Sequence, residues 1–203
     1  MKNKIILVAG GSASGKGHLT NILTKKLNGE CIVVKIDSFC MSRDDLTYEE
    51  RCKLNYDLPT SYNEKELFYY LNKLKNGEEV DLPVYDFTRH IRSKEIEHLK
   101  PKKYIFVEGL FTLYYESILP LGDYKIFMDC SREMRFQRRL FRDMKERARS
   151  EESVTTQFNT QVEPMHQKYI ENTKKNANLI IQNNKNKEIP NEYIQEILKN
   201  IKF

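Results

Sequence analysis

Short runs of apolar residues alternate along this chain with longer stretches in which apolar residues recur at helical spacing. The short runs are rich in Ile, Val and Phe, as expected of strands that are covered on both faces. They predict strands at residues 4–9, 31–36, 104–107, 124–128 and 178–181. Because these strands alternate with helical stretches, the pattern predicts βαβ units around a parallel sheet.

Amphipathic helices are predicted between these strands. The first opens in a glycine-rich loop and has an apolar stripe at Leu19, Ile22, Leu23 and Leu27. The second follows a capping-box pattern that begins at Ser61, and it stops at Gly77. Its apolar stripe is Leu67, Leu71 and Leu74. Residues 133–147 predict a long basic helix, and residues 192–201 predict a terminal amphipathic one.

Residues 82–98 differ from the rest, because β-branched and aromatic residues there alternate with polar ones. This pattern predicts a hairpin that projects from the main sheet. No internal repeat or low-complexity linker divides the 203 residues. The sequence therefore predicts one three-layer α/β domain over residues 1–203 with small insertions.

Composition narrows the function only slightly. The formal net charge of +5 suits an anionic ligand such as a nucleotide or nucleic acid, but a lysine-rich solvated surface explains it equally well. The four cysteines form no C-x-x-C pair, which argues against a disulfide framework or a zinc site. No apolar run approaches the roughly 20 residues that span a bilayer. We expect a cytoplasmic protein that does not bind membranes.

The stretch VAGGSASGKG follows an apolar run and opens an amphipathic helix. Its Gly10, Gly15 and Lys16 match the phosphate-loop pattern G-x-x-x-x-G-K-[ST]. In such a loop, backbone N–H groups and the helix N-terminus point at a phosphate, and the lysine bridges the terminal phosphates. The expected nucleotide-binding residues are Gly10, Gly11, Ser12, Ala13, Ser14, Gly15, Lys16, Gly17 and His18.

Gly17 breaks this pattern, because it stands where a serine or threonine normally holds magnesium. Magnesium keeps several waters in most sites, so another water can replace the missing hydroxyl. Losing one well-placed electrostatic contact costs about 3 kcal/mol, roughly a hundredfold in rate. The imidazole of His18 is a poor magnesium ligand, and Thr20, one turn further along, is expected to be too distant.

Two acids follow strands in the manner that phosphoryl transfer requires. Asp37, in KIDSF, is expected to end the second strand, and Glu108, in VEGL, the third. Because ligands bind at the carboxyl ends of parallel strands, both acids are expected to face the phosphate loop. Asp37 is the candidate base for an alcohol acceptor. Both are candidates for holding Mg²⁺, Glu108 through a water molecule.

Seven arginines lie between Arg132 and Arg149, and Arg135, Arg139 and Arg142 share one helical face. A solvated basic face and an RNA-binding helix are both compatible with this stretch alone. Its position after a strand in a phosphate-loop fold favours a phosphate-binding lid over residues 132–150. No RNA-stacking motif accompanies it, so we expect no nucleic-acid partner.

The order of motifs resembles the uridine kinase family, within the phosphoribulokinase and uridine kinase group of P-loop kinases. The resemblance runs through GGSASGK, KIDSF, NYDLP, LPVYDFTRHIR, VEGL, RRLFRDMKERAR and TKKNANLII, and so covers nearly the whole chain. It implies a P-loop kinase fold with a central parallel sheet, a β-hairpin insertion and an arginine-rich helical lid. It also implies Mg-ATP as the donor, a pyrimidine ribonucleoside as the acceptor, and a homo-oligomer, commonly a tetramer.

The same resemblance implies residue roles. The carboxylate of Asp37 would accept the proton of the nucleoside 5′-hydroxyl, and Asp57 would bind the ribose hydroxyls. Tyr85 and His90 would contact the base, with Phe87 nearby, although an ideal strand would put residues 85 and 90 on opposite faces. Of the lid residues, Arg142 and Arg147 would contact ATP. The remaining matches, which would contact the acceptor, are Arg139, Arg149 and Gln157.

This chain departs from the family pattern at three places: Gly17 in the phosphate loop, Cys40 in place of a tyrosine that lines the acceptor site, and residues 182–186 beside the nucleotide base. Three functions remain open. The first is an ATP-dependent uridine/cytidine kinase with reduced activity. The second is a relative that binds nucleotide or nucleoside with little turnover. The third is a kinase of another nucleoside-like alcohol.

Overall fold

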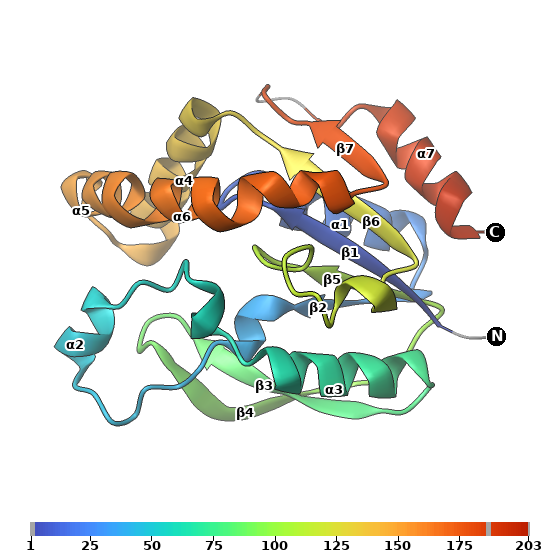
Figure 1. Ribbon diagram of the computed structural model, residues 1–203, viewed down its shortest axis with the longest axis horizontal. Coiled ribbons are helices and arrows are strands. Elements are labelled where there is room, and N and C mark those ends of the chain that lie inside the picture. The colour runs from blue at the N-terminus through green and yellow to red at the C-terminus, as the bar shows by residue number, and fades with distance from the viewer. Residues whose placement is uncertain (1–2, 186–187, 203) are drawn as a thin grey trace.

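A computed structural model describes residues 3–185 and 188–202, and its centre is a parallel five-stranded sheet with the strand order β2-β5-β1-β6-β7 (Figure 1). Residues of β1 pair with β5 on one side and with β6 on the other. The predicted parallel sheet is therefore confirmed. The strands are β1 (Lys4–Gly10), β2 (Cys31–Lys35), β5 (Tyr104–Glu108), β6 (Tyr124–Asp129) and β7 (Leu179–Gln182).

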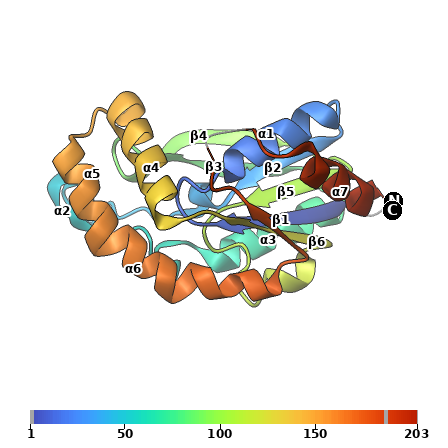
Figure 2. The ribbon, with the colours of Figure 1, turned by 90° about the horizontal axis from the view of Figure 1, so that it is seen from above.

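Helices cover both faces of this sheet, which gives the three predicted layers. In Figure 2, α1 (Lys16–Lys26) and α7 (Asn191–Lys202) lie on one side, and α3 (Glu64–Lys75) and α6 (Glu163–Met165) lie on the other. Because side chains alternate along β1, Ile6 packs under α1 and α7 while Leu7 packs under α3. Among the described residues, no helix is both long and apolar enough to cross a bilayer.

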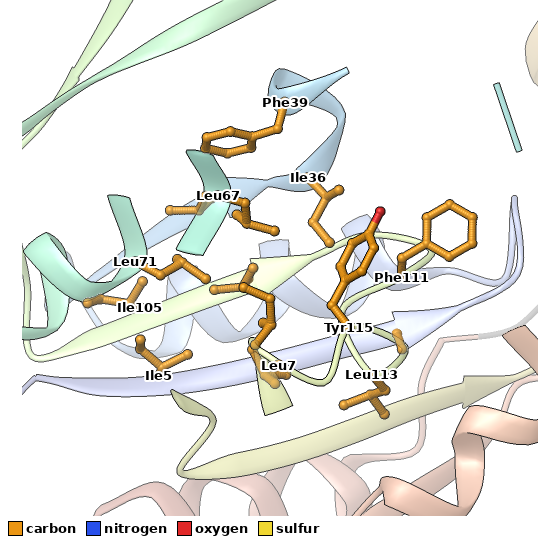
Figure 3. Packing of buried hydrophobic residues seen from close by; sticks show 14 of the residues in the cluster. Ile5, Leu7, Ile36, Phe39, Leu67, Leu71, Ile105, Phe111, Leu113 and Tyr115 are labelled. Atoms are coloured by element: carbon orange, nitrogen blue, oxygen red, sulfur yellow. The ribbon is translucent and has the colours of Figure 1, made fainter. Parts of the chain in front are cut away.

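The core beneath α3 fixes the position of the turn that follows β2. Figure 3 shows Leu67 and Leu71 of α3 packed against strand residues such as Ile5 and Ile105. Ile36 and Phe39, at the two ends of the turn Ile36–Phe39, belong to the same buried cluster. Because both apolar ends of the turn are buried, the polar residues between them are held just beyond the carboxyl end of β2.

The predicted hairpin is present, with β3 (Val80–Asp86) paired antiparallel to β4 (Ile91–Leu99). Its register shifts between Pro83 and Tyr85. Val80 and Leu82 anchor it in the core under α3. A short helix, α2 (Tyr48–Lys53), lies in the loop before α3.

The arginine-rich segment is a long helix, α4 (Arg132–Arg147), capped by the side chain of Ser131. It is followed by an irregular helical run over residues 151–176, which contains α5 (Glu151–Gln157), α6 and π-helical turns. Figure 2 shows α4 and α5 beyond one end of the sheet. We call residues 132–150 the arginine lid.

Two local predictions about α3 have different outcomes. The capping box at Ser61 is wrong: Ser61 lies in a 3₁₀ turn, and Asn63 is the N-cap, accepting a hydrogen bond from the Glu66 N–H. The end at Gly77 is confirmed, because Gly77 has a φ of 87°. The N–H groups of Gly77 and Glu78 close a Schellman motif on the carbonyls of Leu74 and Lys73.

Candidate active site

The phosphate loop connects β1 to α1, as its sequence context predicted. Gly10 and Gly15 have φ values of 143° and 101°, which favour glycine. A Cβ on Gly15 would lie 2.4 Å from Nδ2 of Asn183. The Lys16 Nζ donates hydrogen bonds to the carbonyls of Gly10 and Gly11 at 2.8 and 2.9 Å. The lysine is therefore held over the loop.

One cavity of about 470 Å³ opens in front of this loop, within the usual range for small-molecule sites. Most of the residues singled out from the sequence line it. Of the candidate nucleotide-, metal- and acceptor-binding residues, four do not: Gly10, Gly11 and Ser14 form the loop behind the cavity, and His18 is exposed on α1. The sequence-predicted residues that do line it are Ser12, Ala13, Gly15, Lys16, Gly17, Asp37, Asp57, Tyr85, Phe87, His90, Glu108, Arg139, Arg142, Arg147, Arg149 and Gln157.

Both predicted acids line this cavity, one at the end of β5 and the other in the turn after β2. Glu108 is the last residue of β5, as predicted. The prediction that Asp37 ends a strand is wrong, because β2 stops at Lys35 and Asp37 lies in the turn Ile36–Phe39. Burial raises the pKa of Asp37, an effect that the nearby Lys16 ammonium opposes.

The surroundings of Gly17 and Glu108 fit a magnesium ion of the kind that accompanies nucleotides. Within the described residues, no group of three or more His, Cys, Asp or Glu side chains could hold a metal by itself. Magnesium in such sites needs only one or two carboxylates, with phosphates and waters as its other ligands. A Cβ on Gly17 would lie 3.7 Å from Oε1 of Glu108, so the position of the missing hydroxyl faces a carboxylate.

A residue that the sequence reading missed organises the arginine lid. Asp143 on α4 is fully buried. Its Oδ1 lies 2.8 Å from Nη2 of Arg142 and 3.5 Å from Nη1 of Arg147. Its Oδ2 lies 3.4 Å from Nε of Arg139 and 3.7 Å from Nη1 of Arg149. One carboxylate thus balances four arginines that would otherwise repel one another.

The lid is also connected to the phosphate loop. Arg139 donates to Oγ of Ser12 at 2.8 Å and to Oε1 of Gln157 at 2.9 Å. Arg149 donates to the same amide oxygen at 2.6 Å. Arg135 does not join this group, since it is buried and donates to Glu163 and to the Cys130 carbonyl. Arg135 therefore serves packing, whereas Arg139 and Arg142, predicted to share its helical face, line the cavity.

The opposite wall of the cavity comes from the hairpin and from the loop around Asp57. Tyr85 lies on β3, and His90, with a φ of 53°, lies in the turn, so the chain is not an ideal strand between them and both residues line one cavity. The sequence reading missed Tyr56, whose ring stacks on His90 at 4.9 Å between centroids. Burial, and to a lesser extent Arg149, lowers the pKa of His90. The imidazole is therefore neutral at neutral pH.

The segment of residues 182–186, where the sequence departs from the family pattern, also contacts the phosphate loop. The buried amide of Asn183 donates to the Ser14 carbonyl at 2.8 Å. Asn184 accepts a hydrogen bond from the Ser131 N–H at 2.6 Å, which ties the segment to the start of the lid. Asn186, also in this segment, lies outside the described residues. The polar residues at 183 and 184 therefore brace the loop and the lid together.

The lysine of the phosphate loop and the arginines of the lid line one side of the cavity. Aromatic and acidic residues line the other side. A ligand that uses all of them carries several phosphates at one end and a hydroxyl acceptor at the other. The fold and site define a P-loop kinase. Comparison with known proteins makes the assignment more specific.

Residues 5–190 match the phosphoribulokinase / uridine kinase family. The uridine kinase of Macrococcus caseolyticus is 42% identical over 181 residues, which cover 89% of this chain and 88% of that protein. The uridine kinase of Staphylococcus epidermidis is 43% identical over 178 residues, or 87% and 86% of the two chains. The phosphoribulokinase of Rhodobacter spheroides has the same fold, with a TM-score of 0.66, 17% identity and coverage of 89% and 70%. This chain belongs to the phosphoribulokinase / uridine kinase family and is an ATP-dependent kinase.

ATP affinity is expected to fall as pH rises through about 8. Burial lowers the pKa of Lys16 to about 8, although Glu108 and Asp37 oppose this shift. The free protein therefore loses the ammonium above that pH, whereas bound phosphates favour the charged form, so binding must take up a proton. Titration calorimetry in buffers of different ionisation enthalpy measures this uptake. It should vanish in Lys16→Met and persist in Lys25→Ala, whereas equal affinity on both sides of pH 8 would contradict it.

Proposed function

We propose that this kinase transfers the γ-phosphoryl group of ATP to the 5′-hydroxyl of uridine or cytidine, forming UMP or CMP. The observation that carries the proposal is that the phosphate loop and the YDFTRH turn, residues 85–90, line the same cavity. The relatives named uridine kinase, at 42–43% identity over most of the chain, support it. Four cysteines with free thiols are in keeping with the cytoplasm as the proposed compartment.

In this proposal Asp37 is the general base. The acceptor oxygen attacks the γ-phosphorus, the bond from that phosphorus to the β–γ bridging oxygen breaks, and ADP leaves. The proton of the hydroxyl passes to the Asp37 carboxylate, whose raised pKa makes it a better proton acceptor. Lys16 holds the terminal phosphates, and Arg142 and Arg147 stabilise the negative charge that develops on the transferred group.

Magnesium bound with ATP would neutralise charge on the β- and γ-phosphates, and Glu108 and Asp37 are the carboxylates that would hold it. The cavity also has the groups for a nucleoside. The buried carboxyl of Asp57 would bind the ribose hydroxyls, and Arg139 partly opposes the rise that burial causes in its pKa. Arg139 itself, together with Arg149 and Gln157, would contact the acceptor.

Hydrogen-bonding groups at the base end would select the nucleobase. Tyr85 and the neutral His90 would pair with the polar edge of a pyrimidine, with Phe87 as an apolar neighbour. A pocket that pairs these groups rejects analogues that leave them unpaired. Arg147 lies over the Phe87 ring at 5.4 Å, which connects the base end to the lid.

Two residues favour alternative functions. Gly17 favours a nucleotide-binding relative with little turnover, because the loop hydroxyl is absent. Cys40, 3% exposed in the cavity wall, favours a different nucleoside-like acceptor, because a thiol fills less space than the tyrosine usual in the family. Both alternatives predict a different result in one acceptor assay.

A panel of acceptors with ATP and magnesium tests the proposal. We expect nucleoside-dependent ADP formation with uridine and cytidine, and at least about tenfold lower kcat/KM with 2′-deoxyuridine, because Asp57 then loses the 2′-hydroxyl as a partner. An Asp57→Asn variant should reduce that preference, and Asp44→Asn, an exposed change in the same region, should not. ATP binding without ADP formation would favour the binding relative. Turnover only with other alcohols would favour a different acceptor.

A further inference from the structure

Gly17 lacks the hydroxyl of the phosphate-loop pattern, but Thr20 carries a hydroxyl on the same face of α1. Residues 17 and 20 are three apart on this helix, so their side chains project on one side of it. Thr20 is 3% exposed, and its Oγ1 donates to Oε2 of Glu108 at 2.8 Å. That Thr20 is too distant to replace the missing magnesium ligand stays a prediction, but its hydroxyl does reach Glu108.

Both oxygens of this carboxylate border position 17. A Cβ on Gly17 would lie 3.7 Å from Oε1 and 3.8 Å from Oε2 of Glu108. Apart from the adjacent residues and the backbone of α1 itself, no other atom of the described residues lies within 4 Å of that point. The space of the missing side chain is thus open, and one carboxylate borders it.

We propose that Thr20 is a positioning residue that fixes the Glu108 carboxylate for the magnesium of bound nucleotide and so offsets part of the loss at Gly17. This inference rests on the proposed function only in requiring a magnesium nucleotide, not in requiring a particular acceptor. With Oε2 held by the Thr20 hydroxyl, the carboxylate keeps one rotamer and stays beside the space at position 17. A fixed carboxylate loses less conformational freedom when it binds a cation.

The hydroxyl of Thr20 has one other acceptor within reach, the Gly17 carbonyl at 3.2 Å. A hydroxyl has a single proton, so the two acceptors compete, and the bond to the charged Glu108 is both shorter and stronger. Thr24 provides a natural comparison one turn further along α1. Its Oγ1 donates at 2.8 Å to the Thr20 carbonyl, within the helix and away from Glu108.

The test measures metal binding without turnover. Mn²⁺ is titrated into the protein–ADP complex, and free Mn²⁺ is counted by electron paramagnetic resonance. We expect Thr20→Val to weaken Mn²⁺ binding about tenfold, the range found when a group that orients a metal ligand is removed. Thr20→Ser, which keeps the hydroxyl, and Thr24→Val should both stay within about twofold of the wild type. Circular dichroism confirms that each variant is folded.

A second background tests whether Thr20 offsets the loss at Gly17. Gly17→Ser restores the loop hydroxyl in open space, so Thr20→Val should weaken Mn²⁺ binding less in that background, by about threefold at most. Equal Mn²⁺ affinity for wild type and Thr20→Val would overturn the proposal, as would a wild-type complex that binds Mn²⁺ no better than free ADP. If either of these results were found and the protein still formed UMP, the Thr20 proposal would fail and the proposed function would stand. If Thr20→Val weakened Mn²⁺ binding but the protein formed no UMP, the proposed function would fail and the Thr20 proposal would stand.

Discussion

Replacing Asp37 with Asn is expected to lower kcat about a thousandfold, while ATP without magnesium binds at least as tightly as in the wild type. The amide has the same shape but cannot accept the acceptor's proton. The substitution also removes a negative charge near Lys16, so less negative charge repels the triphosphate. Steady-state assays of UMP formation and fluorescence titration of an ATP analogue measure the two effects separately.

The control for this variant is Asp44→Asn, which changes an exposed carboxylate close in sequence and outside the cavity. It should leave both kcat and ATP affinity unchanged. A fall of less than about tenfold in Asp37→Asn would assign the base role to another group or to water. Lost ATP binding would instead place Asp37 in nucleotide recognition.

Asp143→Asn is expected to lower kcat/KM for ATP about a hundredfold and to destabilise the fold by about 3 kcal/mol. The buried carboxylate is the shared partner of four arginines, three of which are partly exposed to solvent. Without its charge, these guanidinium groups repel one another and leave their positions around the cavity. Urea unfolding and steady-state kinetics, both at a temperature where the variant is folded, give the two values.

A suitable control is Glu146→Gln, which removes an exposed acid from the same helix. It should change stability by less than about 0.5 kcal/mol and leave kcat/KM alone. Asp143→Glu, which keeps the charge, should recover part of the catalytic loss. If Asp143→Asn were destabilised but fully active, the carboxylate would serve the fold only, and the arginines would not depend on it.

Much of the fold followed from the sequence because its signals are local. Each strand is a short apolar run, and the phosphate loop is a fixed spacing of glycines and a lysine between a strand and a helix. The exact ends depend on packing instead. The chain leaves the sheet after Lys35 because Ile36 and Phe39 bury themselves beneath α3, which moves Asp37 into a turn. In the same way, the N-cap of α3 is Asn63 and not Ser61, which the sequence pattern had predicted.

The parts of the site that the sequence did not reveal are contacts between distant segments. The bond from Thr20 to Glu108 joins residues 88 positions apart, and that from Asn183 to Ser14 joins residues 169 apart. Asp143 was indistinguishable from any acid on a charged helix until its burial was known. A helical wheel does place Asp143 one turn from Arg139, so that pairing was the one available signal.

The most direct test of the central claim is product analysis after incubating the purified chain with ATP, magnesium and uridine. Chromatography separates uridine from UMP, and Asp37→Asn prepared in parallel controls for contaminating kinases. We predict UMP from the wild type and about a thousandfold less from the variant. If the two preparations formed equal UMP, or neither formed any while ATP binding was intact, the chain would not be a uridine kinase that uses Asp37 as its base.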